Sequence, residues 1–182
     1  MFHNRSSSLI LRAFSAVLLA SVAFIAVVLS MKNVAPSYAA YLPRHSVTPG
    51  AIDPRVTQAN ISTTICVHGY TKTVRPPVSY TTPLKRSQLQ SGYNLGGDTN
   101  LRDYEEDHLI PLEVGGSPDS VKNLFPEPLN GNYGAHVKDK LENVIHALVC
   151  SHKITLKQGQ AAFTPDWVKG YLKYVGPINA SA

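Results

Sequence analysis

Three side chains in the middle of the chain have the types and order that suit acid–base chemistry. Asp107 and His108 are adjacent, and Asn123 follows them after a loop that contains two glycines. An imidazole titrates near neutral pH, so His108 can take a proton from water without a large change in its pKa. A carboxylate such as Asp107 suits a metal cation, which would neutralise charge on a leaving oxygen. A base, a cation and a group that fixes the base are what phosphodiester hydrolysis needs.

The elements that must position these residues are predicted from periodicity and turn residues. Residues 103–112 are typical of a strand that Pro111 ends or bends, and residues 123–126 are typical of a short second strand. Apolar residues then recur at spacings of three and four and predict one long helix; they are Val137, Leu141, Val144, Ile145 and Leu148. Neighbouring strand residues point to opposite faces, so Asp107 and His108 can share one site only if the strand ends or twists there.

The string EDHLIPL at 106–112, followed by Gly115-Gly116 and Asn123-Leu124, resembles the His-Asn-His (HNH) endonuclease motif. In that motif an acidic-His pair ends the first strand and an Asn-Leu pair begins the second. The rest of the chain is similar to exported bacterial proteins that share the Cys66 region and the Pro126-Glu127-Pro128 segment. The resemblance implies an α+β fold. Its ββα-metal (His-Me finger) core would occupy 104–150, with an N-terminal extended or strand region and two short C-terminal helices around it.

The resemblance also implies a role for each residue of the motif. His108 would be the catalytic base, Asp107 would bind the metal, and Asn123 would hold the His108 loop through side-chain hydrogen bonds. His136, at the start of the helix, is the first choice for a second metal ligand, and two other candidates stay open, Asn132 and Asp139. One divalent ion is expected. Magnesium is favoured, with manganese, zinc or nickel as alternatives, because a carboxylate ligand suits magnesium whereas a histidine admits the others.

The activity that follows is hydrolysis of DNA or RNA by a metal-dependent endonuclease of low sequence specificity. Lys138 and Arg75 are the predicted contacts to substrate phosphates, and such contacts do not depend on base sequence. For Lys138 the competing interpretation is an ordinary helix pair with Glu142. The acidic residues Asp103 and Glu106 are interpreted as a solvated edge.

Two other functions compete with the nuclease. One is a nucleic-acid-binding module of the same fold that has lost catalysis. The other is a structural envelope protein in which Asp107, His108 and Asn123 form a buried polar network without a cleft or a basic rim. The sequence does not indicate whether an inhibitor protein is a partner.

The first forty residues differ in composition from the rest. Arg5 and Arg12 precede an uncharged apolar run from 13 to 29, and Ala39-Ala40 ends the segment with small residues. This layout is typical of a signal peptide, with an uncleaved membrane anchor as the alternative. A secreted protein, extracellular or periplasmic, is therefore expected, and any membrane contact would be through this segment. The net charge of +5 falls to about +2 without it, which neither requires nor excludes a nucleic-acid partner.

The remaining chain fits one domain, with residues 41–60 as an extended arm or linker and 61–182 as the nuclease-like domain. Cys66 and Cys150 are predicted to form a disulfide, because they lie on the exported side of the leader and neither has a CxxC partner. A zinc cluster of these cysteines with nearby histidines is the weaker alternative.

Further elements are predicted outside the core. Short strands or extended segments are expected around Cys66 and Val74, where Thr, Val, Ile and Tyr are frequent. A short helix is expected at 84–89, with Thr82 as its cap and Pro83 at its first turn. Two helices follow the core, one at 156–163 and one that opens at Thr164-Pro165-Asp166 with the threonine as its cap.

Overall fold

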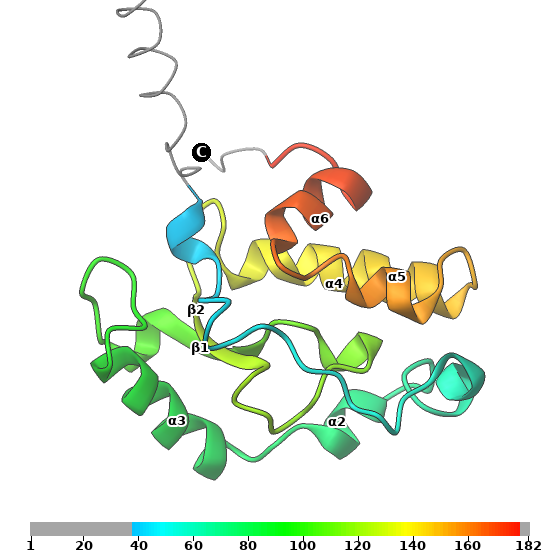
Figure 1. The fold of residues 1–182 in the computed structure, drawn as a ribbon, viewed down its shortest axis with the longest axis horizontal. Helices are drawn as coiled ribbons and strands as arrows, with labels where there is room; N and C mark the ends of the chain where they lie inside the picture. Colours follow the sequence, from blue (N-terminus) through cyan, green and yellow to red (C-terminus); the bar gives the residue numbers. More distant parts are fainter. Residues whose placement is uncertain (1–37, 179–182) are drawn as a thin grey trace, which may run out of the picture. The chain divides into compact units, whose positions relative to one another are not determined.

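The computed structural model describes residues 38–178, and the predicted leader therefore lies almost wholly outside the described residues. Within 38–178, none of the helices has both the length and the apolar character that a membrane crossing requires. The described chain forms a small α+β fold (Figure 1).

A two-stranded antiparallel hairpin lies at the centre of the fold. Strands β1 (Tyr104–His108) and β2 (Leu124–Pro128) pair in a register that runs from Tyr104 opposite Pro128 to His108 opposite Leu124. Both predicted strands are confirmed, although β1 ends at His108 and β2 begins one residue after Asn123. Between them, a loop with a short 3-10 helix (Leu112–Val114) packs into the core.

Helix α3 (Val78–Gln90) packs against both strands (Figure 1). Lys85 donates to the carbonyl oxygens of Leu101 at 2.8 Å and Tyr104 at 2.6 Å, and Gln88 donates to the carbonyl of Leu124 at 3.0 Å. The hairpin has no third strand whose N–H groups could donate to the outer carbonyls of Tyr104 and Leu124. Side chains of α3 donate to them instead. The hairpin is therefore covered by a helix where a larger sheet would have another strand.

Helix α4 (Ala135–Cys150) confirms the helix predicted from the apolar spacing. It buries Leu141, Ile145 and Val149 completely, and these belong to the same hydrophobic core as Phe125 and Trp167. The two C-terminal helices are also present, α5 (Leu156–Gln160) and α6 (Trp167–Tyr174). Asp166, and not Thr164, caps α6, because its carboxylate accepts from the backbone N–H groups of Val168 and Lys169.

Two predictions for the region before the hairpin are wrong. Around Cys66 and Val74 the described chain has no strand: a 3-10 helix (Gln58–Thr63), turns and helix α2 (Tyr70–Val74) stand there. Local bonds outweigh the preference of β-branched residues for strands, since Thr64 donates its hydroxyl to Asn60 O at 2.8 Å. The helix predicted at 84–89 is present as part of α3, but its predicted start is wrong, because α3 begins directly after Pro77 and Pro83 lies inside it.

The arm at 41–60 is hydrogen-bonded into the domain. Gly50 N donates to Lys122 O, Asp53 N to Gly115 O, and Ser117 N to Ala51 O, each at 2.8 Å. All three bonds join the arm to the loop between β1 and β2, and Ile52 forms an isolated bridge with Gly116. The arm thus holds the loop that follows His108.

The disulfide between Cys66 and Cys150 is confirmed, with the two Cα atoms 5.6 Å apart. It joins the turn after the first 3-10 helix to the last residue of α4 across 84 positions of sequence. A loop of that length predicts a stabilisation of about 4 kcal/mol through the entropy of the unfolded chain. The alternative zinc cluster loses its thiolates, since both sulfurs are bonded to each other.

Candidate functional site

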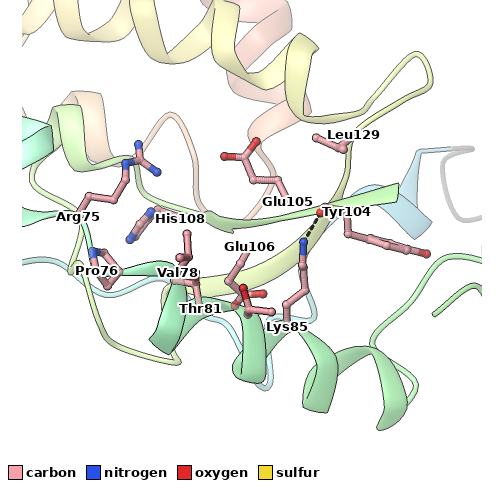
Figure 2. A pocket seen from close by; sticks show the side chains of 11 residues that line it. Arg75, Pro76, Val78, Thr81, Lys85, Tyr104, Glu105, Glu106, His108 and Leu129 are labelled. Carbon is pink, nitrogen blue, oxygen red and sulfur yellow. Dashed lines mark hydrogen bonds between the residues drawn. The ribbon is translucent and has the colours of Figure 1, made fainter. Parts of the chain in front are cut away.

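His108 lies at the base of an open pocket of about 340 Å³. The walls come from β1, from the start of α3 and from the segment between α2 and α3 (Figure 2). The charged and titratable residues of the lining are His108, Arg75, Lys85, Tyr104, Glu105 and Glu106. The pocket was not predicted as such, but two of its residues, His108 and Arg75, were predicted as base and phosphate contact.

The imidazole of His108 is held in one orientation. Its Nε2 lies 2.8 Å from the carbonyl oxygen of Pro118, which can only accept, so the proton of the neutral ring sits on Nε2 and the lone pair on Nδ1. Burial lowers the pKa of His108, and Arg75 lowers it further, while Asp107 and the Pro118 carbonyl act in the opposite direction. A neutral ring with a free Nδ1 is the form that accepts a proton.

Asn123 fixes the loop that carries Pro118, through both ends of its side chain. Its Oδ1 accepts from Ile110 N at 2.9 Å and from Ala51 N at 3.4 Å. Its Nδ2 donates to Ile110 O at 2.9 Å and to Ser117 O at 3.0 Å. The fully buried amide thus joins the loop to the arm, which is an arrangement of the kind the motif implied.

Gly116 permits this close packing. A Cβ at this position would lie 1.7 Å from Ile110 O and 2.9 Å from Asn123 Nδ2. Any side chain would therefore displace the backbone that Asn123 binds. The second glycine of the Gly115-Gly116 pair is required by a close approach, and not by an unusual backbone angle.

Asp107 points to the opposite face of β1 from His108. The strand continues through Asp107 to His108, and each is paired in regular register with β2. Asp107 Oδ2 accepts from Lys138 Nζ of α4 at 2.5 Å. The condition for one shared site, a strand that ends or twists between the two residues, is not met.

Lys138 lies at the centre of a buried cluster of carboxylates, defined here as Lys138 with Asp107, Glu127 and Glu142. Its Nζ also donates to Glu142 Oε1 at 2.6 Å and to His108 O at 3.0 Å, and lies 3.5 Å from Glu127 Oε2. Lys138 and Glu127 are both fully buried. The lysine was predicted to contact substrate, but its ammonium is enclosed by protein, and the alternative pairing with Glu142 is present.

Burial and mutual attraction act against each other in this cluster. Burial alone would lower the pKa of Lys138, but the three carboxylates raise it well above its usual range. Burial raises the pKa of Glu127 well above its usual range and that of Glu142 to about 7, in both cases against the attraction of Lys138. For Asp107, burial is the largest single effect and raises the pKa, but Lys138, Glu127 and His108 together outweigh it, and the pKa is lowered. The ion pair of Lys138 with Asp107 is therefore the charged centre of the cluster.

The predicted metal ligands are not brought together. The His136 side chain is 72% exposed, and its Nδ1 lies 3.8 Å from Asp139 on the outer side of α4. Asn132 is exposed in the turn before the helix. Asp107 is covered by the ammonium of Lys138. As arranged, these residues do not fit a divalent ion bound by Asp107 and a ligand from α4. Within residues 38–178, the group of three potential ligands found close together is Cys66, His146 and Cys150.

Glu106 corrects the interpretation of the acidic run as a solvated edge. It is 8% exposed, and neither carboxylate oxygen has a hydrogen-bond partner among the described residues. Burial raises the pKa of Glu106 to about 8, and burial also raises that of Glu105. Strand alternation could have found this, because Glu106 lies two residues from His108 and so on the same face, toward α3 (Figure 2).

Comparison of the chain with protein-family models, with curated proteins and with solved structures gave no match. The resemblance to HNH endonucleases thus stays a prediction from the motif.

Proposed function

We propose that this protein hydrolyses phosphodiester bonds of DNA or RNA, with His108 as the general base. The observation that carries the proposal is the imidazole at the base of an open pocket, its Nε2 held by the Pro118 carbonyl and its Nδ1 left to accept a proton. A water molecule in the pocket would lose its proton to Nδ1 as its oxygen bonds to phosphorus; the P–O bond to the departing sugar oxygen breaks, and that oxygen takes a proton from solvent.

Arg75 supplies positive charge on the pocket wall. It is exposed, and it comes from the extended segment between α2 and α3. A guanidinium can donate two parallel hydrogen bonds to a phosphate and stays charged at any physiological pH. Arg75 is therefore assigned to the phosphate, in contact with the charge that develops in the transition state.

The two glutamates of the pocket do not prevent anion binding. Glu106, with a pKa of about 8, is mostly protonated at neutral pH, and the raised pKa of Glu105 acts in the same direction. The repulsion that two ionised carboxylates would exert on a phosphate is reduced accordingly. No step of this proposal passes through a metal ion.

A structural or binding protein without catalysis is the second candidate, and one observation favours it. His108 is only 2% exposed and Asn123 is fully buried, as a structural polar network requires. The pocket above His108 and the exposed Arg75 on its wall favour the enzyme. The enzyme requires Nδ1 of His108 to contact the attacking water and the substrate, whereas a structural or binding protein does not.

The test is cleavage of supercoiled plasmid and of labelled RNA by the oxidised protein, in EDTA and in magnesium, manganese, zinc or nickel. His108→Ala should lose cleavage and Arg75→Ala should cleave more slowly at a measurable rate, and Lys157→Ala, an exposed lysine of α5, serves as the charge control. Cleavage that His108→Ala retains would contradict the assignment of the base. A folded protein that cleaves neither polymer would favour the binding or structural alternative.

A further inference from the structure

The four oxygens around Lys138 Nζ form a cation site that the chain itself fills. Asp107 Oδ2 lies at 2.5 Å, Glu142 Oε1 at 2.6 Å, and His108 O at 3.0 Å, with Glu127 Oε2 at 3.5 Å. Carboxylate and carbonyl oxygens are also the usual ligands of hard divalent cations. The ammonium occupies the position at which the motif would place a metal.

We propose that Lys138 is the permanent cation of this site, in place of a divalent metal ion, so that the proposed hydrolysis needs no metal. The inference about cleavage rests on the proposed function, whereas the occupation of the cation site by Lys138 does not. Lys138 is then a positioning residue. It binds the backbone of His108 and does not line the pocket.

The hydrogen-bond capacity of the ammonium is used up within the protein. A lysine ammonium has three N–H donors, and its three contacts at 3.0 Å or less are to Asp107, Glu142 and His108. The side chain is fully buried, so no donor remains for a phosphate or for water. This excludes the substrate contact predicted for Lys138 and leaves it a role inside the site.

A divalent ion at Asp107 would have to displace this ammonium. Lys138 would then leave a fully buried position and give up two ion pairs within 2.6 Å. The ammonium and the metal compete for the same oxygens, and the ammonium is held covalently at the site by α4. The competition therefore favours the lysine at ordinary metal concentrations.

Lys138 also connects the cluster to the pocket. Its bond to His108 O reaches the backbone of the residue whose side chain enters the pocket on the other face of β1. The lysine thus fixes the peptide from which the imidazole projects and compensates the charge of Asp107 behind it.

The first test is binding of Mn²⁺ to the full oxidised protein. Binding is measured as the loss of the electron paramagnetic resonance signal of free Mn²⁺. The wild type should leave the signal unchanged at equimolar Mn²⁺. Lys138→Ala and Lys138→Met should each bind one ion and lose the free signal, because they leave the carboxylates without a cation. Lys140→Ala, an exposed lysine of the same helix, should behave as the wild type.

Stoichiometric Mn²⁺ binding by the wild type that Asp107→Asn abolishes would overturn the proposal, and this measurement needs no Lys138 variant to fold. A folded Lys138→Ala or Lys138→Met that binds no Mn²⁺ would overturn it too. In the cleavage assay, the wild type should have equal rates in EDTA and in magnesium, and loss of cleavage in EDTA would contradict metal independence. If nothing is cleaved but the Mn²⁺ pattern is as expected, the proposed function fails and the lysine cation stands.

Discussion

The charged groups on the two faces of β1 lie in different environments. The face toward α3 carries His108 in an open pocket with Arg75, whereas the face toward α4 carries Asp107 in a closed cluster with Lys138. Two residues that are adjacent in the motif are therefore separated by the strand itself. The difference shows that neighbours in sequence can serve two environments, one open to a ligand and one that is part of the protein's core.

The largest expected effect of a substitution is on the pocket face. His108→Ala should reduce cleavage by about 100- to 10,000-fold, because it removes the general base. The free energy of unfolding should change much less than for a residue of the cluster. Initial rates on plasmid and RNA, with urea unfolding in parallel, measure both quantities. A small loss of rate together with a large loss of stability would assign His108 to the core and remove the contrast between the faces.

On the α4 face, the expectation is reversed. Lys138→Ala should lower the free energy of unfolding by about 3–5 kcal/mol, since it leaves buried carboxylates without their partner. Arg75→Ala should be close to neutral for stability, because the side chain is exposed. Urea titrations of the two variants at neutral pH make this comparison directly. Equal losses would mean that Arg75, too, is a structural cation.

Glu106 gives a pH-dependent form of the same test. Its pKa is about 8 in the folded protein and near 4.5 when unfolded, so a rise in pH ionises the unfolded chain first and lowers the free energy of unfolding between these values. Glu106→Gln removes this dependence. The variant should match the wild type near pH 4 and exceed it by up to roughly 5 kcal/mol above pH 8. Thermal or urea unfolding across pH 4 to 9 measures the gain, and a constant difference at all pH values would refute the burial of a protonated Glu106.

The smallest effect expected is a shift of the pH–rate profile. His108 acts as a base when neutral, and its pKa is lowered by burial, so the rate should rise with pH through a pKa below 6.5 and then stay level. Arg75→Ala removes a charge that lowers this pKa, and its profile, scaled to its own maximum, should rise at higher pH. A profile that Arg75→Ala does not move would mean that the guanidinium does not act on the imidazole.

The elements with strong local patterns were predictable from the sequence. The apolar spacing after residue 136 found α4, and the residues around His108 and Asn123 found the hairpin and its loop. Helix α2 and the 3-10 helix before it were missed because Thr and Val are common to strands and to turns with side-chain bonds. Only tertiary contacts decide between the two in such a segment.

Part of the candidate site was predictable from the sequence. His108 and Arg75, both singled out there, line one pocket, and the pairing of Lys138 with Glu142 follows from helical spacing. The association of Lys138 with Asp107 and Glu127 was not predictable, since it joins α4 to both strands of the hairpin. Glu106 was within reach of sequence reasoning, because the alternation of β1 places it on the His108 face.

The bonds of the arm to the loop between β1 and β2 also bear on the order of folding. Asn123 binds Ala51 as well as its neighbours Ile110 and Ser117, so the loop is complete only when a distant, earlier part of the chain has returned to it. Contacts of such sequence separation form late, because chain entropy must be lost before they are gained. The arm is synthesised before the loop between β1 and β2 that it binds. We therefore expect the His108 imidazole to be fixed only once the arm has bound the loop.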